Sequence, residues 1–193
     1  MKLVILGRDG TVNERGADIV DSADAWKPLP GALEAIARLN HAGWHVVVAS
    51  NQDGLGRGLF EVAALNAIHA RMHRMLAAVG GRVDAVFYCP HAPEDGCRCR
   101  KPEPGLLEQI GERFAVELTG IPVVGDSLDD MLASASAGCE SHLVLTGRTR
   151  PVPGEPLATT FPAATMVHDD LAAFAHYLVT RPAVPVAPRQ AAH

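Results

Sequence analysis

The sequence predicts an α/β protein with a doubly wound, mostly parallel sheet of the Rossmann type and helices on both faces of that sheet. Short apolar runs rich in β-branched residues alternate along the chain with longer segments whose apolar residues recur every three to four positions. Such alternation is typical of parallel sheets, because two parallel neighbours must be joined by a crossover, usually a helix. Clusters of polar residues also follow the first four runs, as expected where ligands bind beyond the carboxyl ends of parallel strands.

The apolar runs have the length of strands that are buried on both faces. The predicted strands comprise residues 2–6, 45–49, 85–88, 121–124 and 142–145. The predicted helices comprise residues 31–41, 62–79, 105–114, 128–137 and 169–178. Residues 151–162 contain several prolines and are predicted to form a loop.

The length of the chain allows one well-formed hydrophobic core. A domain of 193 residues, of which 48% are hydrophobic, buries roughly 70% of the surface that its unfolded chain exposes. We therefore predict a single domain over residues 1–180. Residues 181–193 are rich in Pro and Ala without a periodic apolar face, so we predict a disordered tail there.

Charge and hydropathy argue against several classes of partner. A formal net charge of -5 gives no general attraction to nucleic acid or anionic lipid. The N-terminal segment lacks the pattern of a secretory signal, and no apolar run approaches the roughly 18 residues that span a bilayer. We expect a monomeric, cytoplasmic protein without nucleic-acid or membrane partners. In that reducing compartment, cysteines that crowd one short segment favour a metal over disulfides.

Polar clusters directly follow four of the predicted strands. They lie at residues 7–11, 50–52, 89–101 and 125–130. Each cluster alone matches an ordinary turn, because Gly, Asp, Ser and Asn dominate turns. The carboxyl ends of parallel strands meet at one edge of a sheet, however, so together the clusters predict a single ligand-binding crevice.

The third cluster contains a potential metal site. Its members are Cys89, His91, Cys97 and Cys99. Three thiolates and one imidazole form a closed tetrahedral set for Zn2+, with no open position for catalysis, so the predicted zinc is structural. The alternative is three free surface thiols beside a chance histidine. A zinc-bound loop here would deliver Arg100 and Lys101 directly to the crevice.

These clusters resemble, in order and spacing, the four motifs of the haloacid dehalogenase superfamily of aspartate-based phosphatases. The matching segments are residues 6–11, 50–52, 100–102 and 125–126. Within the superfamily, the Cys/His cluster is similar to that of the heptose-bisphosphate phosphatases, with a resemblance over about residues 1–147. Asn13, Arg57-Gly58 and Pro104-Gly105 favour that family. Asp53-Gly54-Leu55-Gly56 favours the related histidinol phosphatases.

In this superfamily the first motif reads Asp-x-Asp. The first carboxylate attacks phosphorus and binds magnesium, and the second protonates the leaving group and then activates water. The resemblance places Asp9 in the second role, but the first position is Gly7, which offers neither a nucleophile nor an anionic ligand. We therefore predict that the chain is close to inert as a phosphatase. Gly at this position could result from a deliberate substitution, from a natural inactive variant or from a sequence error.

The resemblance also implies a Mg2+ site and a phosphate site. Asp126 and the backbone carbonyl of Asp9 would bind Mg2+ together with waters and substrate phosphate. Ser50 and Asn51 would donate hydrogen bonds to the phosphate, and Lys101 would balance its charge.

Other residues of these motifs are predicted to recognise the rest of the substrate. Gln52 completes the second motif, and Arg100 has the planar fork suited to a second phosphate or to sugar hydroxyls. Arg15 and Asp18 follow the first motif, where a loop often closes such sites, so they are predicted to contribute to sugar specificity. Asp130 is interpreted as a residue that stabilises the N-terminus of a helix.

The leading hypothesis from these residues is a phosphatase that acts on a phosphorylated sugar with Mg2+ and Zn2+ as cofactors. The resemblance implies removal of the C7 phosphate of D-glycero-D-manno-heptose 1,7-bisphosphate in lipopolysaccharide precursor synthesis, in a form inactivated by Gly7. One alternative is histidinol-phosphate phosphatase. The other is a non-catalytic phosphosugar-binding protein in which Gly7 is native.

Overall fold

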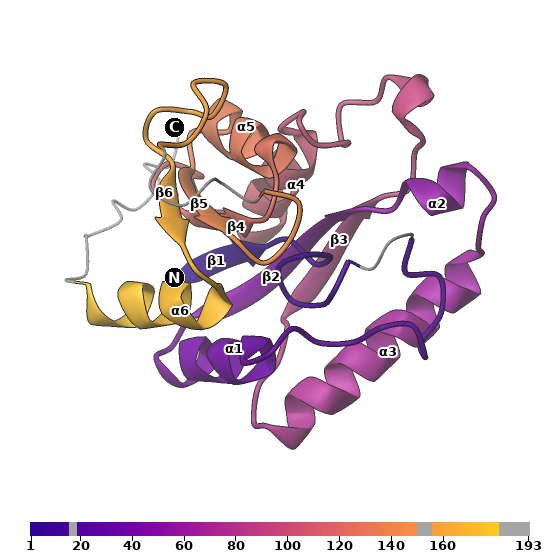
Figure 1. The fold of residues 1–193 in the computed structure, drawn as a ribbon, viewed down its shortest axis with the longest axis horizontal. Coiled ribbons are helices and arrows are strands. Elements are labelled where there is room, and N and C mark those ends of the chain that lie inside the picture. Colours follow the sequence, from indigo (N-terminus) through magenta and orange to yellow (C-terminus); the bar gives the residue numbers. More distant parts are fainter. Residues whose placement is uncertain (16–18, 150–155, 182–193) are drawn as a thin grey trace.

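The computed structural model describes residues 1–15, 19–149 and 156–181 and contains a six-stranded parallel sheet (Figure 1). Its strands are β1 (Leu3–Leu6), β2 (His45–Asn51), β3 (Ala85–Cys89), β4 (Pro122–Gly125), β5 (Glu140–Val144) and β6 (Met166–His168). The spatial order is β3-β2-β1-β4-β5-β6, and all neighbouring pairs are parallel. The chain therefore winds outward in two directions from the adjacent strands β1 and β4, which confirms the predicted doubly wound sheet. The point where the winding direction reverses is where such sheets bind ligands.

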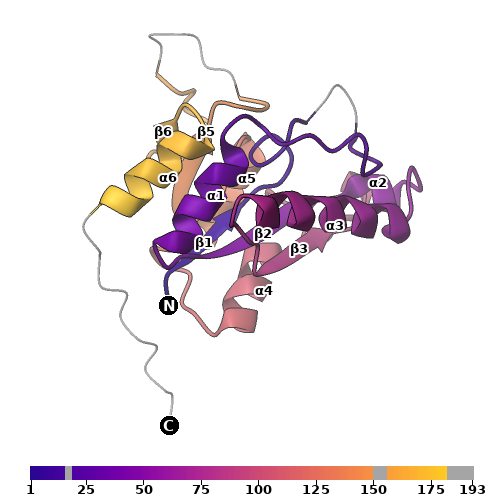
Figure 2. The same cartoon turned by 90° about the horizontal axis from the view of Figure 1, so that it is seen from below.

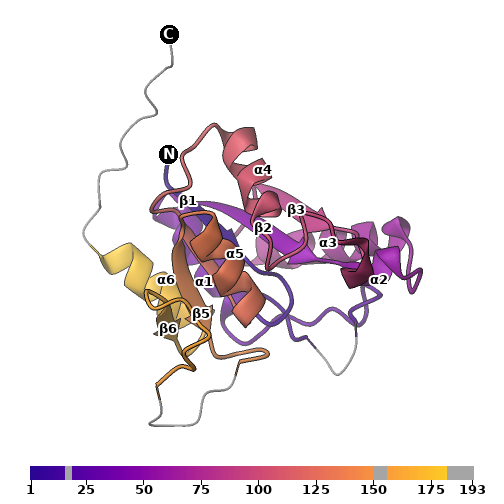
Figure 3. The same cartoon turned by 90° about the horizontal axis from the view of Figure 1, so that it is seen from above.

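Helices cover both faces of the sheet, giving three layers. One face carries α1 (Ala32–His41), α3 (Val62–Ala78) and α6 (Leu171–Thr180), seen in front in Figure 2. The other carries α4 (Gly105–Phe114) and α5 (Leu128–Ser136), seen in front in Figure 3. Alternate residues of β1 serve the two faces: Val4 and Leu6 pack with the first set of helices, and Leu3 and Ile5 pack with the second.

Several elements differ from the predicted ones. The short helix α2 (Asp53–Gly56), the 3-10 turn η1 (Pro93–Asp95) and the edge strand β6 were not predicted. Each has at most four residues, too few to show a helix or strand period. The predicted last helix begins two residues later, because Asp170 accepts a hydrogen bond from the Ala173 backbone N–H and thereby caps α6. It also ends two residues later, at Thr180.

Some predictions fall on residues that the structure does not describe. Residues 151–155 of the predicted loop at 151–162 lie outside the described residues, as do Asp18 and nearly all of the predicted tail. The single domain over residues 1–180 and the monomeric state stay predictions. Across the described ranges, the structure has no helix with the length and hydropathy that crossing a bilayer requires.

Two histidines are buried together at the β5–β6 edge. Nδ1 of His142 lies 3.0 Å from Nε2 of His168, and the His142 ring packs edge-on against Phe174. Burial, followed by the nearby His168 and Arg181, lowers the pKa of His142 to about 3. Burial also lowers the pKa of His168. Both rings are therefore neutral at pH 7 and are joined by one hydrogen bond.

This pair predicts a loss of stability in mild acid. An unfolded histidine titrates near 6.5, so the unfolded chain binds more protons than the folded chain as the pH falls from about 6.5 toward 3. The stabilising effect of a neutral His142 is complete above that range and declines within it. We expect His142→Asn, which cannot titrate, to flatten the change in unfolding free energy between pH 7 and pH 5.

Urea denaturation at both pH values measures this effect. His176, exposed on α6, provides the control variant His176→Asn, which should leave the pH dependence unchanged. An equal pH dependence in His142→Asn and the unaltered chain would contradict the assignment. Lower overall stability of the variant does not affect the comparison, because the slope with pH is what is measured.

Candidate active site

A cleft opens at the carboxyl ends of β1, β2 and β4, where the strand order reverses. It is lined by residues from all four polar clusters, including Gly7, Asp9, Ser50, Asn51, Arg100, Lys101 and Asp126. Arg15 also lines it, whereas Gln52 is buried behind it. The predicted convergence of the clusters is therefore confirmed by their geometry.

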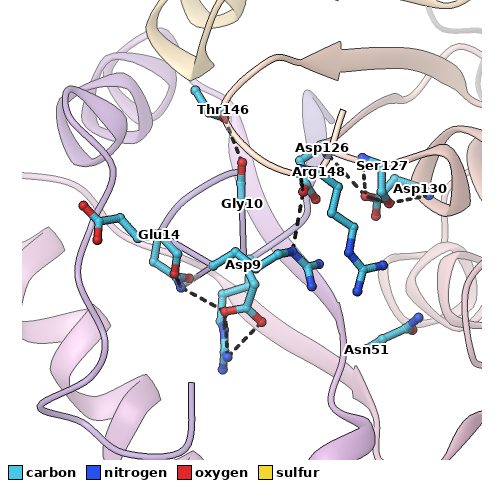
Figure 4. Close-up of polar contacts among 12 residues, drawn as sticks. Asp9, Gly10, Glu14, Asn51, Asp126, Ser127, Asp130, Thr146 and Arg148 are labelled. Carbon is cyan, nitrogen blue, oxygen red and sulfur yellow. Dashed lines mark hydrogen bonds and ion pairs between the residues drawn. The ribbon is translucent and has the colours of Figure 1, made fainter. Parts of the chain in front are cut away.

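Asp9, labelled in Figure 4, is held in one orientation by three neighbouring side chains. Nη2 of Arg8 donates to both carboxylate oxygens at 2.9 and 3.0 Å. Asn13 and Gln52 donate to the same group at 2.9 and 3.1 Å. Burial raises the pKa of Asp9, but the charge of Arg8 and these hydrogen bonds outweigh it, so the pKa lies below its usual value. Asp9 is thus an ionised and oriented carboxylate.

Arg8 is a site residue that the sequence analysis missed. Its side chain is fully buried, and its guanidinium also contacts Oε1 of Gln52 and Nε2 of His69, each at 3.4 Å. Burial and the charge of Arg8 lower the pKa of His69 to about 4, so His69 is neutral and accepts a hydrogen bond from Arg8. A charged residue in a polar turn gives no sequence signal of such burial.

Gly7 leaves a neighbouring hydroxyl without a partner. A Cβ atom at position 7 would lie 3.1 Å from Oγ1 of Thr11 and 3.5 Å from the carbonyl oxygen of Val124. Among the described residues, the buried Thr11 hydroxyl has no hydrogen-bond partner. The backbone at Gly7 is not in the left-handed region, so a Cβ atom there needs only a slight rotation of Thr11. Position 7 therefore has room for a Cβ atom beside the Thr11 hydroxyl.

Asp126 offers a buried carboxylate at the edge of the cleft. It accepts a hydrogen bond of 2.7 Å from the backbone N–H of Arg148, and Nε of Arg15 lies 3.6 Å away. Burial and the nearby charge of Asp130 raise its pKa. Gly10 and Gly147 lie so close that a Cβ atom at either would overlap the Asp126 carboxylate.

These features fit a small, hard cation. Mg2+ takes oxygen ligands and keeps several waters, so the buried Asp126 carboxylate offers one protein ligand of the kind that this ion requires. Burial and the charge of Asp130 keep the pKa of Asp126 raised although Nε of Arg15 lies 3.6 Å away. A cation bound there would favour the ionised form.

Lys101 is fixed at the floor of the cleft. Its Nζ donates to Oδ1 of Asp130 at 2.5 Å and to the carbonyl oxygen of Ala49 at 2.8 Å. Asp130 also accepts from Ser127 in the capping box of α5, which confirms its predicted place at a helix N-terminus. Burial raises the pKa of Asp130, but Lys101 outweighs burial and holds it below its usual value. The ion pair with Lys101 was not predicted.

The second cluster supports the Lys101 loop. The Asn51 amide donates to the carbonyl oxygen of Lys101 at 2.9 Å and accepts from its backbone N–H at 3.1 Å. Ser50 accepts a hydrogen bond of 2.6 Å from Gln52. Asn51 therefore has a positioning contact in addition to its predicted contact with phosphate.

Arg100 lies on the rim of the cleft beside a carboxylate. Its Nη1 is 3.5 Å from Oδ1 of Asp53, the first residue of α2. Asp53 is also 3.8 Å from Arg57. The predicted recognition residue Asp18 lies outside the described residues, so only Arg15 of that pair is placed at the cleft.

The four predicted zinc ligands form one compact cluster. The ligand atoms of Cys89, His91, Cys97 and Cys99 all lie within 4.8 Å of one another. Sulfur–sulfur distances are 3.3 to 3.5 Å, and Nδ1 of His91 is 3.2 Å from the Cys99 sulfur. A tetrahedral zinc with bonds of about 2.3 Å to sulfur separates its ligands by about 3.8 Å, so these residues fit Zn2+.

Comparison with known proteins agrees with this geometry. The sequence model of the polynucleotide kinase 3 phosphatase family matches residues 5–134, and that of the HAD-hydrolase-like family matches residues 98–174. A D-glycero-beta-D-manno-heptose-1,7-bisphosphate 7-phosphatase of Bordetella bronchiseptica is 54% identical over 179 residues, which cover 93% of this chain and 98% of that protein. A phosphatase of the same name from Pseudomonas aeruginosa is 48% identical over 177 residues, 92% of this chain and 97% of that protein.

A solved structure is similar over the same length. The crystal structure of the B. bronchiseptica D,D-heptose 1,7-bisphosphate phosphatase, complexed with magnesium and phosphate, has a TM-score of 0.88 at 54% identity. The match covers 93% of this chain and 98% of that chain. A relative of this fold therefore binds both magnesium and phosphate.

The thiolate cluster predicts one tightly bound zinc ion per chain. Freshly purified protein should retain zinc through gentle chelation, as measured by elemental analysis, because zinc binding is coupled to folding of the loop. Cys99→Ala should release zinc and lower the melting temperature. Cys139→Ala is the matched control, because Cys139 lies outside the cluster. A zinc content near zero in the unaltered chain would contradict the site.

Proposed function

The chain belongs to the haloacid dehalogenase superfamily and, within it, to the D-glycero-beta-D-manno-heptose-1,7-bisphosphate 7-phosphatase family, and from this membership we propose that its cleft binds heptose 1,7-bisphosphate with the 7-phosphate at the floor. The observation that carries the proposal is the convergence of Asp9, Lys101 and Asp126 around position 7 in one cleft. The heptose-bisphosphate relatives favour this substrate over histidinol phosphate.

Each buried group of the floor has a defined task in phosphoryl transfer. Lys101 and the hydroxyl of Ser50 offset the charge of the phosphate. Asp126 and the carbonyl of Asp9 would hold Mg2+, which, when bound, draws charge from the phosphate oxygens. Transfer also requires an in-line nucleophile and a proton for the leaving sugar oxygen.

Asp9 is suited to the proton transfer. It is ionised in the free chain, so it can accept a proton from an attacking water. The approach of an anionic phosphate raises the pKa of a neighbouring carboxyl, which favours the protonated form that donates to the leaving oxygen. The contacts of Asp9 with Arg8, Asn13 and Gln52 hold it in this role and away from attack on phosphorus.

We further propose that the chain binds its substrate but does not turn it over. Gly7 supplies no nucleophile, and the partnerless hydroxyl of Thr11 marks where a position-7 carboxylate would accept a hydrogen bond. The lack of a nucleophile at Gly7 by itself favours the second candidate function, a non-catalytic phosphosugar-binding protein in which Gly7 is native.

Gly7→Asp is expected to create magnesium-dependent hydrolysis of heptose 1,7-bisphosphate. The rate should rise at least about 10³-fold over the unaltered chain, because hydrolysis of phosphate monoesters is extremely slow without a nucleophile. The measurement is phosphate release with and without Mg2+, with histidinol phosphate as the second substrate. Gly7→Ala adds a Cβ atom without a carboxylate and should remain inactive.

A second change separates attack from proton transfer. Adding Asp9→Asn to Gly7→Asp should remove most of the gained rate, because the leaving oxygen would lack its proton donor. Strong activity of the unaltered chain would contradict the role of position 7. A folded, zinc-loaded Gly7→Asp variant that is inactive on both substrates would contradict the functional assignment.

A further inference from the structure

The cations of the cleft differ in whether they have a counterion. Those with a carboxylate partner form the pairs Arg8–Asp9 at 2.9 Å, Arg15–Asp126 at 3.6 Å, Arg100–Asp53 at 3.5 Å and Lys101–Asp130 at 2.5 Å. Arg148 also lines the cleft, yet within the described part of the chain no carboxylate lies at ion-pair distance from its guanidinium. Among the described residues, Arg148 therefore offers a positive charge without an ion-pair partner.

The backbone at Arg148 is anchored against the cleft. Its N–H donates to the carboxylate of Asp126 at 2.7 Å, and the N–H of Thr149 donates to the Asp126 carbonyl at 3.0 Å. The hydroxyl of Thr146 donates to the carbonyl of Gly10 at 2.7 Å. The start of the side chain is thus fixed, while the residue itself is exposed. Figure 4 shows the Arg148 side chain extending from beside Asp126 toward Asn51.

The depth of these groups separates two regions of the cleft. The floor, with Ser50, Lys101 and Asp126, is buried and suits the phosphate that is transferred. The rim carries Arg100 after β3 and Arg148 after β5, on opposite sides of the point where the strand order reverses. The remainder of a bound sugar phosphate must therefore pass between two rim arginines.

The two rim arginines are chemically different. Asp53 lies 3.5 Å from Arg100 and 3.8 Å from Arg57, so the Arg100–Asp53 pair offers both donors and an acceptor, as sugar hydroxyls require. The Arg148 guanidinium has no carboxylate partner in the described ranges, so an anion there can take two parallel hydrogen bonds from it. The charge pattern thus assigns an anion to one rim residue and hydroxyls to the other.

We propose that Arg148 binds the phosphate of the substrate that is not transferred, and that the Arg100–Asp53 pair contacts the sugar hydroxyls. This rests on the proposed function, in which the 7-phosphate occupies the floor and a second phosphate lies at the far end of the sugar. Arg148 is then the residue that distinguishes a bisphosphate from a monophosphate.

Calorimetric titration of the unaltered chain, with Mg2+ present, tests this without turnover. The ligands are heptose 1,7-bisphosphate and heptose 7-phosphate, which share the floor phosphate and differ in the distal one. Arg148→Ala should weaken binding of the bisphosphate roughly 10- to 100-fold and that of the 7-phosphate less than about threefold. Arg148→Lys should recover part of the difference, because it keeps the charge and loses the fork.

Two further variants serve as controls. Arg113→Ala removes an equal charge from an exposed site on α4 and should change neither affinity. Arg100→Ala should weaken both ligands to a similar extent, because both carry the sugar. Raising the salt concentration should reduce the effect of Arg148→Ala, because the residue is exposed.

The outcomes separate this proposal from the proposed function. Equal losses for both ligands in Arg148→Ala, or no loss, would overturn the assignment of Arg148. A selective loss of the bisphosphate in Arg100→Ala alone would place the distal phosphate at the β3 side and would also overturn it. If the unaltered chain binds neither ligand, the proposed function itself fails, which is evident before any variant is compared.

Discussion

The cleft depends on the buried ion pair between Lys101 and Asp130. The pair connects three parts of the fold, because Lys101 follows the zinc loop, Asp130 caps α5 after β4, and the same ammonium group binds Ala49 near the end of β2. Removing one partner of a buried pair leaves the other charge uncompensated and costs about 3–5 kcal/mol. The contacts of Asn51 with the Lys101 backbone fix the same point from β2. Any bound phosphate therefore meets a positive charge whose position is set before binding.

The zinc loop supports this arrangement from outside the sheet. The segment from Cys89 to Cys99 has little regular structure beyond the short turn η1, so four metal ligands replace the backbone hydrogen bonds that hold other segments. A Cβ atom at Gly56 would lie 2.7 Å from the backbone nitrogen of Ala92. The zinc loop thus packs against the α2 turn, and Asp53 of that turn contacts Arg100 at the rim of the cleft.

The sequence predicted the parts of the molecule that repeat a pattern. Residues 2–6 and 45–49 are apolar runs of strand length, and Cys89 to Cys99 has ligand spacing, so both strands and the metal cluster were identified. The positions of Arg8 and Arg148 at the cleft depend on contacts between segments far apart in the chain, and neither residue type nor spacing reveals them. Strand β6 is short and half exposed, so no alternation marks it. The partner of Lys101 depends on how α5 is placed on the sheet.

The contacts of Asp9 bear on how such a site can be moved between scaffolds. Two of the three side chains that orient this carboxylate, Arg8 and Asn13, lie within the first turn, but the third, Gln52, comes from the end of β2. Arg8 in turn contacts His69 of helix α3. The first motif is therefore not a portable unit: a graft that carried only residues 6–13 into another sheet would transfer the carboxylate without the neighbours that fix its direction. The smallest segment set that could be transferred with its geometry intact therefore comprises the ends of two adjacent strands, β1 and β2, and not a single loop.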